Sequence, residues 1–359
     1  MRRMLVLLTM VTLHGANAFQ WTQAHPATSP PPMEQPMMAQ FGDKVLLFGG
    51  SEQLNGATVG QTWLWDGTNW THVTSFGLFG NLAAPPSRVG AGMAFNPDTG
   101  QVVLFGGIDT QSHLLNDTWA FALHTVTLGG FQRTFLEWDQ LTTTGVPPAR
   151  SQTMMEFDPA SRAVILTSGA TGAQDFADTW AFTSSPPTWT QLSTSLAGVR
   201  AQSAMAKCGV RFSCTTVNGR LSCPIVAAPS RILLFGGSNG TILGDQLDFS
   251  NGAWHGPLTT QTQPSARFEH AMAYHQDSGL TLLYGGQGSV IQGDTWVAQC
   301  FDPSVSSVPT WTQLSLTPNP GLRFMHAMAS GPNGSVVLFG GLKLSGTFAV
   351  SNETWVFSN

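Results

Sequence analysis

Six apolar runs recur along the chain, five ending in a glycine pair and one in Ser-Gly, and their spacing constrains the fold more than any other feature. The runs are VLLFGG, VVLFGG, a degenerate VILTSG, ILLFGG, TLLYGG and VVLFGG. Counted from the first glycine, with Ser168 in its place once, they fall at positions 49, 106, 168, 236, 285 and 340, which are 57, 62, 68, 49 and 55 residues apart. A period of this size, with room for four short strands in each unit, is typical of the blades of a β-propeller.

Two tryptophan positions follow the glycine pairs. An Asp-Thr-Trp type triplet comes first, as in Asp117-Thr118-Trp119, and it becomes Asp245-Gln246-Leu247 in the fourth unit. A second Trp then begins another strand-like segment and recurs as Trp70, Trp138, Trp189, Trp254 and Trp311. Glycine pairs permit a positive φ and a close backbone approach, against which an indole can pack, so we interpret these residues as structural. The LFGG, N-D-T-W and PPxR elements together resemble the secreted, bacterial-type kelch repeat over nearly the whole mature chain.

The two ends of the chain predict how the ring closes. The sixth unit stops shortly after Trp355 without its outer strand, whereas residues 19–24 contain a matching Trp-Thr-Gln sequence around Trp21. Joining the two ends in one blade leaves no unpaired sheet edge. We therefore predict one all-β domain over residues 19–359, a six-bladed kelch-type β-propeller whose last blade is completed by the N-terminal outer strand.

The first 18 residues have the features of a secretory signal peptide. Arg2 and Arg3 precede an apolar stretch over residues 4–13, and Ala16-Asn17-Ala18 offers a cleavage site. Ten apolar residues are too few to span a bilayer, so we expect no membrane insertion after cleavage. The prediction is a secreted or periplasmic protein. A net charge of -5 argues against nucleic acid as a partner.

The four cysteines fit an oxidising compartment. An insertion over residues 207–229 contains Asn218-Gly219, a strong hairpin signal that places Cys214 opposite Cys223 in a geometry suited to a disulfide. Cys208 then remains for Cys300, and a four-stranded blade brings both to the same face in neighbouring blades. The alternatives are four free thiols, or a zinc site for which the paired short spacing is lacking.

The first strand of each unit is expected to line the central axis, and five units carry an arginine before it: Arg88, Arg150, Arg200, Arg267 and Arg323. We assign Glu34 to the corresponding place in the first unit. Five residues after each arginine stands a methionine, which we interpret as core packing. Each guanidinium either ties its loop to carbonyls of a neighbouring blade or, with the others, binds a carboxylate or sulfate at the channel mouth.

Histidines occur three residues after the arginine only in the last two units, as His270 and His326. A polar site is therefore predicted where these units meet the first, with candidate ligand-binding residues Glu34, Arg200, Arg267, Glu269, His270, Arg323 and His326. The alternative for the histidines is an internal inner-strand role. No third ligand accompanies them, so we expect no metal there, and no cofactor is predicted.

Three functions remain open at this point. The first is a secreted, non-catalytic propeller that binds a protein or carbohydrate through its channel mouth and connecting loops. The second is a carbohydrate-active enzyme similar to the kelch-type sialic acid epimerases, with Glu269, His270 or His326 as acid or base. The third is a structural module of a surface assembly, for which an exposed apolar patch would be the sign.

Overall fold

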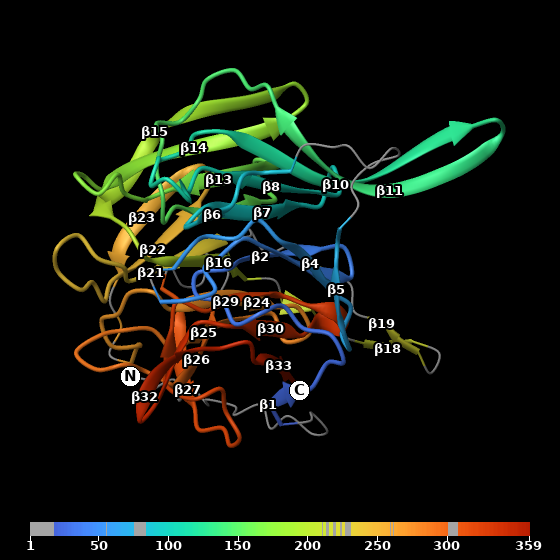
Figure 1. Ribbon diagram of the computed structural model, residues 1–359. Helices are drawn as coiled ribbons and strands as arrows, with labels where there is room; N and C mark the ends of the chain where they lie inside the picture. Colours follow the sequence, from blue (N-terminus) through green and yellow to red (C-terminus); the bar gives the residue numbers. More distant parts are fainter. Residues whose placement is uncertain are drawn as a thin grey trace.

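The computed structural model describes residues 18–54, 56–74, 84–209, 231–258, 260, 262–300 and 308–359, and the backbone of residues 211–212, 215–217, 220–222 and 225–226 (Figure 1). The predicted signal segment therefore lies almost wholly outside the described residues. The described part consists of β-strands, loops and one short 3-10 turn, η1 (Pro332–Gly334). Within it, no helix is long and apolar enough to cross a membrane.

Six four-stranded antiparallel sheets make up the body of the structure, and we number them I to VI in the order of their repeats. From the innermost strand outward, sheet I contains β2 (Met37–Phe41), β3 (Lys44–Phe48), β4 (Thr62–Trp65) and β5 (Trp70–His72). Sheet II contains β7 (Gly92–Asn96), β8 (Gln101–Phe105), β10 (Thr118–Leu128) and β11 (Phe131–Leu141). Sheet III contains β12 (Met154–Asp158), β13 (Ala163–Thr167), β14 (Phe176–Ser184) and β15 (Pro187–Arg200).

The second half of the chain repeats this order. Sheet IV contains β16 (Ala204–Cys208), β21 (Arg231–Phe235), β22 (Gln246–Ser250) and β23 (Ala253–Leu258). Sheet V contains β24 (Ala271–His275), β25 (Leu280–Tyr284), β26 (Thr295–Gln299) and β27 (Thr310–Leu314). Sheet VI contains β29 (Ala327–Ser330), β30 (Val336–Phe339), β33 (Thr354–Ser358) and β1 (Gln20–Ala24).

Shorter strands form small sheets in the connecting loops. β6 (Arg88–Val89) pairs with β9 (Ile108–Asp109), and β28 (Arg323–Phe324) pairs with β31 (Leu342–Ser345), which in turn pairs with β32 (Thr347–Val350). In the insertion, β17 (Arg211–Phe212) pairs with β20 (Ile225–Val226), and β18 (Thr215–Val217) pairs with β19 (Arg220–Ser222). The last pair is the hairpin predicted from Asn218-Gly219.

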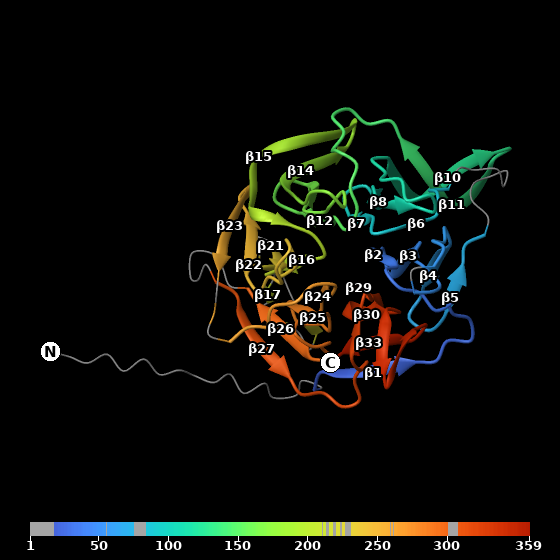
Figure 2. The ribbon, with the colours of Figure 1, turned by 60° about the vertical axis from the view of Figure 1, so that its left-hand side comes forward.

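The sheets pack face to face around a common axis, as a β-propeller does (Figure 2). Each of the six hydrophobic clusters joins two consecutive sheets, and one of them joins sheet VI to sheet I through Ala327, Val337 and Met38. Because both faces of every sheet are covered, the second strand is buried along nearly its whole length, as in VLLF of β3. This is why the LFGG runs are continuously apolar instead of alternating.

The strand β1 is the outermost strand of sheet VI, although it lies at the opposite end of the chain. Trp21 faces Phe357, and Gln23 faces Trp355, in an antiparallel ladder between β1 and β33. Trp21 is 1% exposed and packs with residues of sheets V and VI. The segment predicted to complete the last unit therefore pairs with its C-terminal strand.

A tryptophan in each outer strand is hydrogen-bonded to the preceding sheet. Its indole Nε1 donates a hydrogen bond of 2.7 to 3.0 Å to the side chain of the second residue in that sheet's Asp-Thr-Trp type triplet. The pairs are Trp21–Thr295, Trp70–Thr354, Trp138–Thr62, Trp189–Thr118, Trp254–Thr179 and Trp311–Gln246. Gln246 replaces the usual threonine without loss of the bond, because its Oε1 is also an acceptor.

The disulfide predicted between Cys208 and Cys300 is present and joins sheet IV to the end of β26 in sheet V. The Cα atoms are 5.6 Å apart, which is the usual separation for a disulfide. Cys214 and Cys223 lie outside the described residues, so their pairing stays a prediction. The structure describes no free cysteine.

Removing this bridge should destabilise the protein. The bond spans 92 residues, and closing a loop of that size in the unfolded chain lowers its entropy, so the Cys208→Ser/Cys300→Ser variant should lose about 4 kcal/mol. Urea unfolding of the variant and of the oxidised parent, followed by circular dichroism, measures the difference. A loss below about 1 kcal/mol would contradict the expectation.

Candidate functional site

A cavity opens on the axis at the end of the ring where the chain enters the innermost strands. Glu269, His270 and His326 all line it, so the structure brings together three of the residues predicted for a polar site. Its volume is about 140 Å³. This is smaller than the pockets that enclose drug-sized ligands, so the cavity suits a small group at most. A second, deeper cavity continues along the axis among Met154, Ser203 and Ala271.

The mouth is built from one residue of each repeat that adopts a left-handed backbone conformation. These residues stand two positions after the arginine or its equivalent and have φ between 51° and 66°; they are Gln35, Gly90, Gln152, Gln202, Glu269 and Met325. Backbone N–H groups of this set donate to carbonyls of the preceding repeat, including Glu269 to Gln202 at 2.9 Å and Gln35 to Met325 at 2.8 Å. Non-glycine residues avoid this conformation unless the surrounding structure imposes it, and such strain is frequent at binding sites.

Three glutamine side chains therefore line the mouth beside Glu269. Gln35, Gln152 and Gln202 were not among the predicted site residues, although the glutamines of Arg-Ser-Gln at 150–152 and Arg-Ala-Gln at 200–202 stand at the same offset from the arginine as Glu269. Each amide offers both donors and an acceptor. Among the described residues lining the cavity, Glu269 is the only acidic one and none is lysine or arginine.

The carboxyl group of Glu269 is poised between its charged and neutral forms. Its pKa is raised to about 7, mainly by burial and also by the nearby charge of Glu34, while a hydrogen bond from Gln202 opposes the shift. That bond joins Nε2 of Gln202 to Oε1 of Glu269 at 2.8 Å. The carboxyl group is thus held in a fixed position at the mouth, where a cationic partner would favour its ionised form.

Glu269 should make the stability of the protein depend on pH. Because its pKa is higher in the folded than in the unfolded state, the folded protein binds more protons between about pH 4.5 and 7, and stability falls as the pH rises through this window. Glu269→Gln mimics the neutral acid, so its stability relative to the parent should rise with pH by up to about 1.4 kcal/mol per unit and then level off. Urea unfolding across pH measures this, with the exposed Glu52→Gln as control. Parallel curves for Glu269→Gln and the parent would contradict it.

The two histidines have internal aromatic neighbours. His270 is edge-on to Phe235, and His326 is edge-on to Tyr284, each a residue of the preceding sheet. Burial, together with the charge of Arg323, lowers the pKa of His326 to about 3, and burial, Arg267 and His326 hold that of His270 well below its usual value. Both imidazoles are therefore neutral at physiological pH.

The arginines are occupied by partners within their own repeats. Arg267, which is completely buried, binds both carboxylate oxygens of Asp294 at 2.7 and 3.0 Å and donates to the carbonyl of Gly285 at 2.9 Å. Arg200 makes the same contacts with Asp245 and Gly236. Arg323 pairs with Glu353, which also accepts from Lys343. None of the three lines the cavity in the described structure.

Glu34 does not occupy the position of the arginines, contrary to the sequence assignment. The second glycine of each pair donates its N–H to the carbonyl of the next repeat's arginine, as from Gly50 to Arg88, and Gly341 donates in the same way to Met33. Met33 is thus the equivalent residue. Glu34 is buried one position later, where its backbone pairs with Ser51. The sequence alignment was displaced by one residue because Met33 lacks the charge that marks the other repeats.

In the first repeat, Met33 replaces the arginine and a second residue replaces its acidic partner. The acidic partner of the arginine is replaced by Gln61 in the first repeat, and Oε1 of Gln61 accepts a hydrogen bond from Nε1 of Trp63 at 2.9 Å. In the second repeat, Asp117 accepts the same bond from Trp119 at 2.7 Å. Both charges of the buried pair are therefore missing together, which avoids leaving one of them without a counter-charge.

Comparison with known protein families agrees with the repeat architecture. The model of the KLHDC2/KLHL20/DRC7 Kelch-repeats domain matches residues 37–223, more than half of the chain. The match covers sheets I to III and the beginning of sheet IV, whereas Glu269, His270 and His326 lie beyond it. A search of curated proteins finds no match.

Proposed function

The chain belongs to the KLHDC2/KLHL20/DRC7 Kelch-repeats domain family, and from this premise we propose that it is an exported, non-catalytic propeller whose channel mouth binds a basic side chain of a protein partner. Kelch-repeat domains generally mediate protein interactions, and the fold of this chain is a β-propeller. The observation that carries the finer proposal is the chemistry of the mouth. A carboxyl group and three amides line the opening, and these groups are suited to recognise a cationic side chain of a partner.

Charge decides which partner group suits the mouth. The candidate arginines are neutralised by Asp245, Asp294 and Glu353, so they offer little attraction to a carboxylate or sulfate. Glu269 is the acidic group among the described lining residues, and a lysine or arginine of a partner would lower its raised pKa and pair with it. The amide oxygens of Gln35, Gln152 and Gln202 would accept hydrogen bonds from the remaining N–H groups of that lysine or arginine.

Two observations support export. Residues 1–18 have the charged, apolar and small-residue regions of a signal peptide. The disulfide between Cys208 and Cys300 is compatible with an oxidising compartment, in which such bonds persist.

The non-catalytic assignment rests on the state of the candidate acid and base groups. His270 and His326 line the cavity but are buried and neutral, which leaves Glu269 as the one predicted acid or base with a pKa near 7. General acid and base catalysis is effective when a second group activates or orients the reacting atom. The described mouth offers amides for that purpose, which suit recognition better than proton transfer.

A displayed library of random peptides tests the proposal directly. Peptides rich in lysine or arginine should be enriched on the immobilised parent and on the control Glu52→Gln, which removes an exposed carboxylate elsewhere. Binding to Glu269→Gln should fall by about tenfold or more, because a charge-assisted hydrogen bond is lost. Since Glu269 ionises near pH 7, binding to the parent should strengthen between pH 6 and pH 8.

Three outcomes would contradict the proposal. The first is equal binding of the same peptides to Glu269→Gln and to the parent, which would place the binding surface elsewhere. The second is enrichment of acidic peptides. The third is no peptide enrichment together with thermal stabilisation by acidic or neutral glycans, which would favour the carbohydrate-binding alternative.

A further inference from the structure

The two outer strands of sheet II extend beyond the rest of their sheet. β10 pairs with β8 only from Thr118 to Phe121, whereas its ladder with β11 continues to Leu128 and Phe131. Figure 1 shows this hairpin projecting from the body of the molecule. A two-stranded ribbon without a third strand is of marginal stability in water, so the outer half of the hairpin needs some other support.

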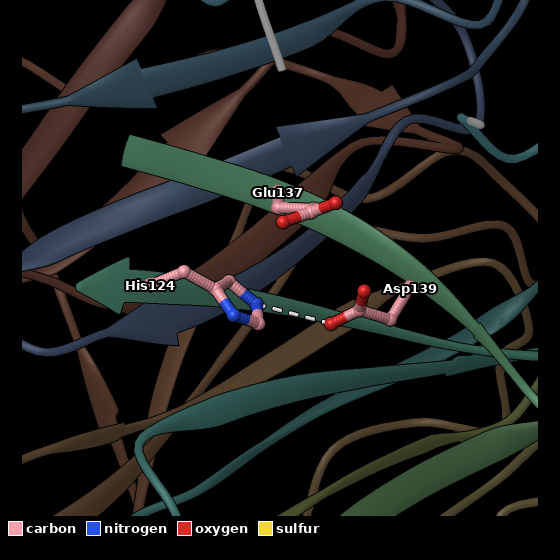
Figure 3. A group of neighbouring side chains, drawn as sticks. All are labelled: His124, Glu137 and Asp139. Atoms are coloured by element: carbon pink, nitrogen blue, oxygen red, sulfur yellow. Dashed lines mark ion pairs between the residues drawn. The ribbon is translucent and has the colours of Figure 1, made fainter. Parts of the chain in front are cut away.

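Three metal-ligating side chains gather on one face of this hairpin. His124 belongs to β10, and Glu137 and Asp139 belong to β11. Figure 3 shows the imidazole directed toward Asp139, with Glu137 beside it. One ligand atom from each residue lies within 4.8 Å of the other two, and all three residues are half-buried.

The ladder explains why these residues meet. Residues two apart on a strand share a face, so Glu137 and Asp139 are neighbours on β11. They lie opposite Ala122 and Ala120, whose small side chains leave space above β10. His124, opposite Phe135, stacks on that ring with an interplanar angle of 14° and a centroid separation of 5.8 Å, which orients its imidazole along the strand.

The imidazole Nε2 of His124 is not engaged in a hydrogen bond with any described residue and could therefore coordinate a metal ion. Nε2 of His124 lies 3.0 Å from Oδ2 of Asp139, yet the contact lacks the alignment of a hydrogen bond, and this shielded nitrogen makes none in the described structure. Two carboxylates this close to one another repel when both are ionised. A divalent cation placed among the three groups would balance both charges and coordinate the imidazole nitrogen.

We propose that His124, Glu137 and Asp139 form a Zn²⁺ site that clamps the projecting hairpin of β10 and β11. An imidazole with two carboxylates suits zinc, which accepts nitrogen and oxygen ligands in tetrahedral geometry, better than Ca²⁺ or Mg²⁺, which prefer oxygen ligands alone. Three protein ligands leave one position for water or for a donor of a partner. The ligands come from both strands, so the metal ties the ribbon together across its ladder.

The clamp would control the exposed end of the hairpin. Phe131 is 76% exposed and Leu128 is 50% exposed, directly beyond the ribbon that the metal would hold. A rigid ribbon presents these apolar side chains in one orientation and lowers the entropy cost of contact with a partner. This site shares no residue with the channel mouth, and it does not depend on the proposed function of that mouth.

The test uses the tag-free mature protein titrated with ZnCl₂ by isothermal calorimetry, with Cys208 and Cys300 in the disulfide. We expect one Zn²⁺ per chain, and binding at least about tenfold weaker in His124→Ala and in Asp139→Asn. His113→Ala is the matched control, because His113 forms a comparable exposed pair with Asp109 at 3.2 Å and should leave binding unchanged. Hydrogen exchange of residues 122–137 should slow on addition of Zn²⁺ in the parent and in His113→Ala, but not in His124→Ala.

The proposal is overturned by any of three results. These are the absence of stoichiometric Zn²⁺ binding, an affinity for Zn²⁺ unchanged in both His124→Ala and Asp139→Asn, and binding of Zn²⁺ that leaves exchange in the hairpin unaltered. Each variant should remain folded, because these half-buried residues lie outside the hydrophobic clusters. Circular dichroism of each variant without metal checks this.

Discussion

Replacing Arg88 with methionine is expected to destabilise the protein by about 3 kcal/mol, because the half-buried carboxylate of Asp117, whose side chain is 18% exposed, then loses its counter-charge. Arg88 is completely buried and binds both oxygens of Asp117, at 2.6 and 2.8 Å, and the carbonyl of Gly106 at 2.9 Å. Urea unfolding followed by circular dichroism measures the loss.

The first repeat provides the matched control for this experiment. Combining Arg88→Met with Asp117→Gln recreates the Met33 and Gln61 combination, in which the amide oxygen still accepts the indole N–H. The double variant should recover at least about half of the stability lost by Arg88→Met, since a neutral replacement of a buried ion pair is often tolerated. If the loss in the double variant equals the sum of the losses in Arg88→Met and Asp117→Gln, the two residues are not coupled and the expectation is contradicted.

Replacing Trp21 with alanine should cost about 3–5 kcal/mol, as expected for a large side chain in a core. Trp21 is 1% exposed, forms edge-to-face contacts with Tyr284 and Phe357, and donates a hydrogen bond to Thr295. The cost arises because β1 joins the N-terminal end of the domain to sheet VI.

Trp138→Ala is the control, because Trp138 has the same role in sheet II, where all four strands come from one stretch of the chain. Similar losses in the two variants would support closure through β1. Trp21→Phe should lose less, since it keeps most of the packing and forfeits the hydrogen bond alone. A loss below about 1 kcal/mol for Trp21→Ala, beside a full loss for Trp138→Ala, would argue against a stabilising role for β1.

The fold could be predicted because its constraints are local and repeated. A Cβ on Gly106, whose φ is 70°, would lie 2.6 Å from the carbonyl oxygen of Arg150, so glycine is favoured at this crossing, and Ser168 takes its place in the third repeat with a φ of 61°. The tryptophans are equally regular because each must reach an acceptor in the preceding sheet. The pairing of Cys208 with Cys300 followed from the position of both residues in the expected strand order, and the structure confirms it.

The candidate site could be predicted only in part. Glu269, His270 and His326 do meet at one cavity, because they vary where the repeats are otherwise alike. Glu34 was assigned to the position of the arginines, one residue after the true equivalent Met33. The first repeat has neither the arginine nor its acidic partner, so no charge marks the position. The hairpin cluster around His124 was missed because a sequence gives no indication that β10 and β11 continue past their sheet.

The amino-acid sequence by itself determined the repeated unit, since apolar runs that end in glycine and the tryptophans that follow them act over short distances and recur along the chain. Only the tertiary structure decided how the charges are used. Whether an arginine binds a ligand or an internal aspartate depends on which groups contact its guanidinium in the folded protein. For Arg88 and Arg200 these groups include residues that are 18 and 45 positions away in sequence. The raised pKa of Glu269 likewise depends on burial and on Glu34, which is 235 residues away in sequence but close in space. Coulomb interactions and desolvation follow distances in the folded molecule, and those distances exist only once the sheets have closed around their axis.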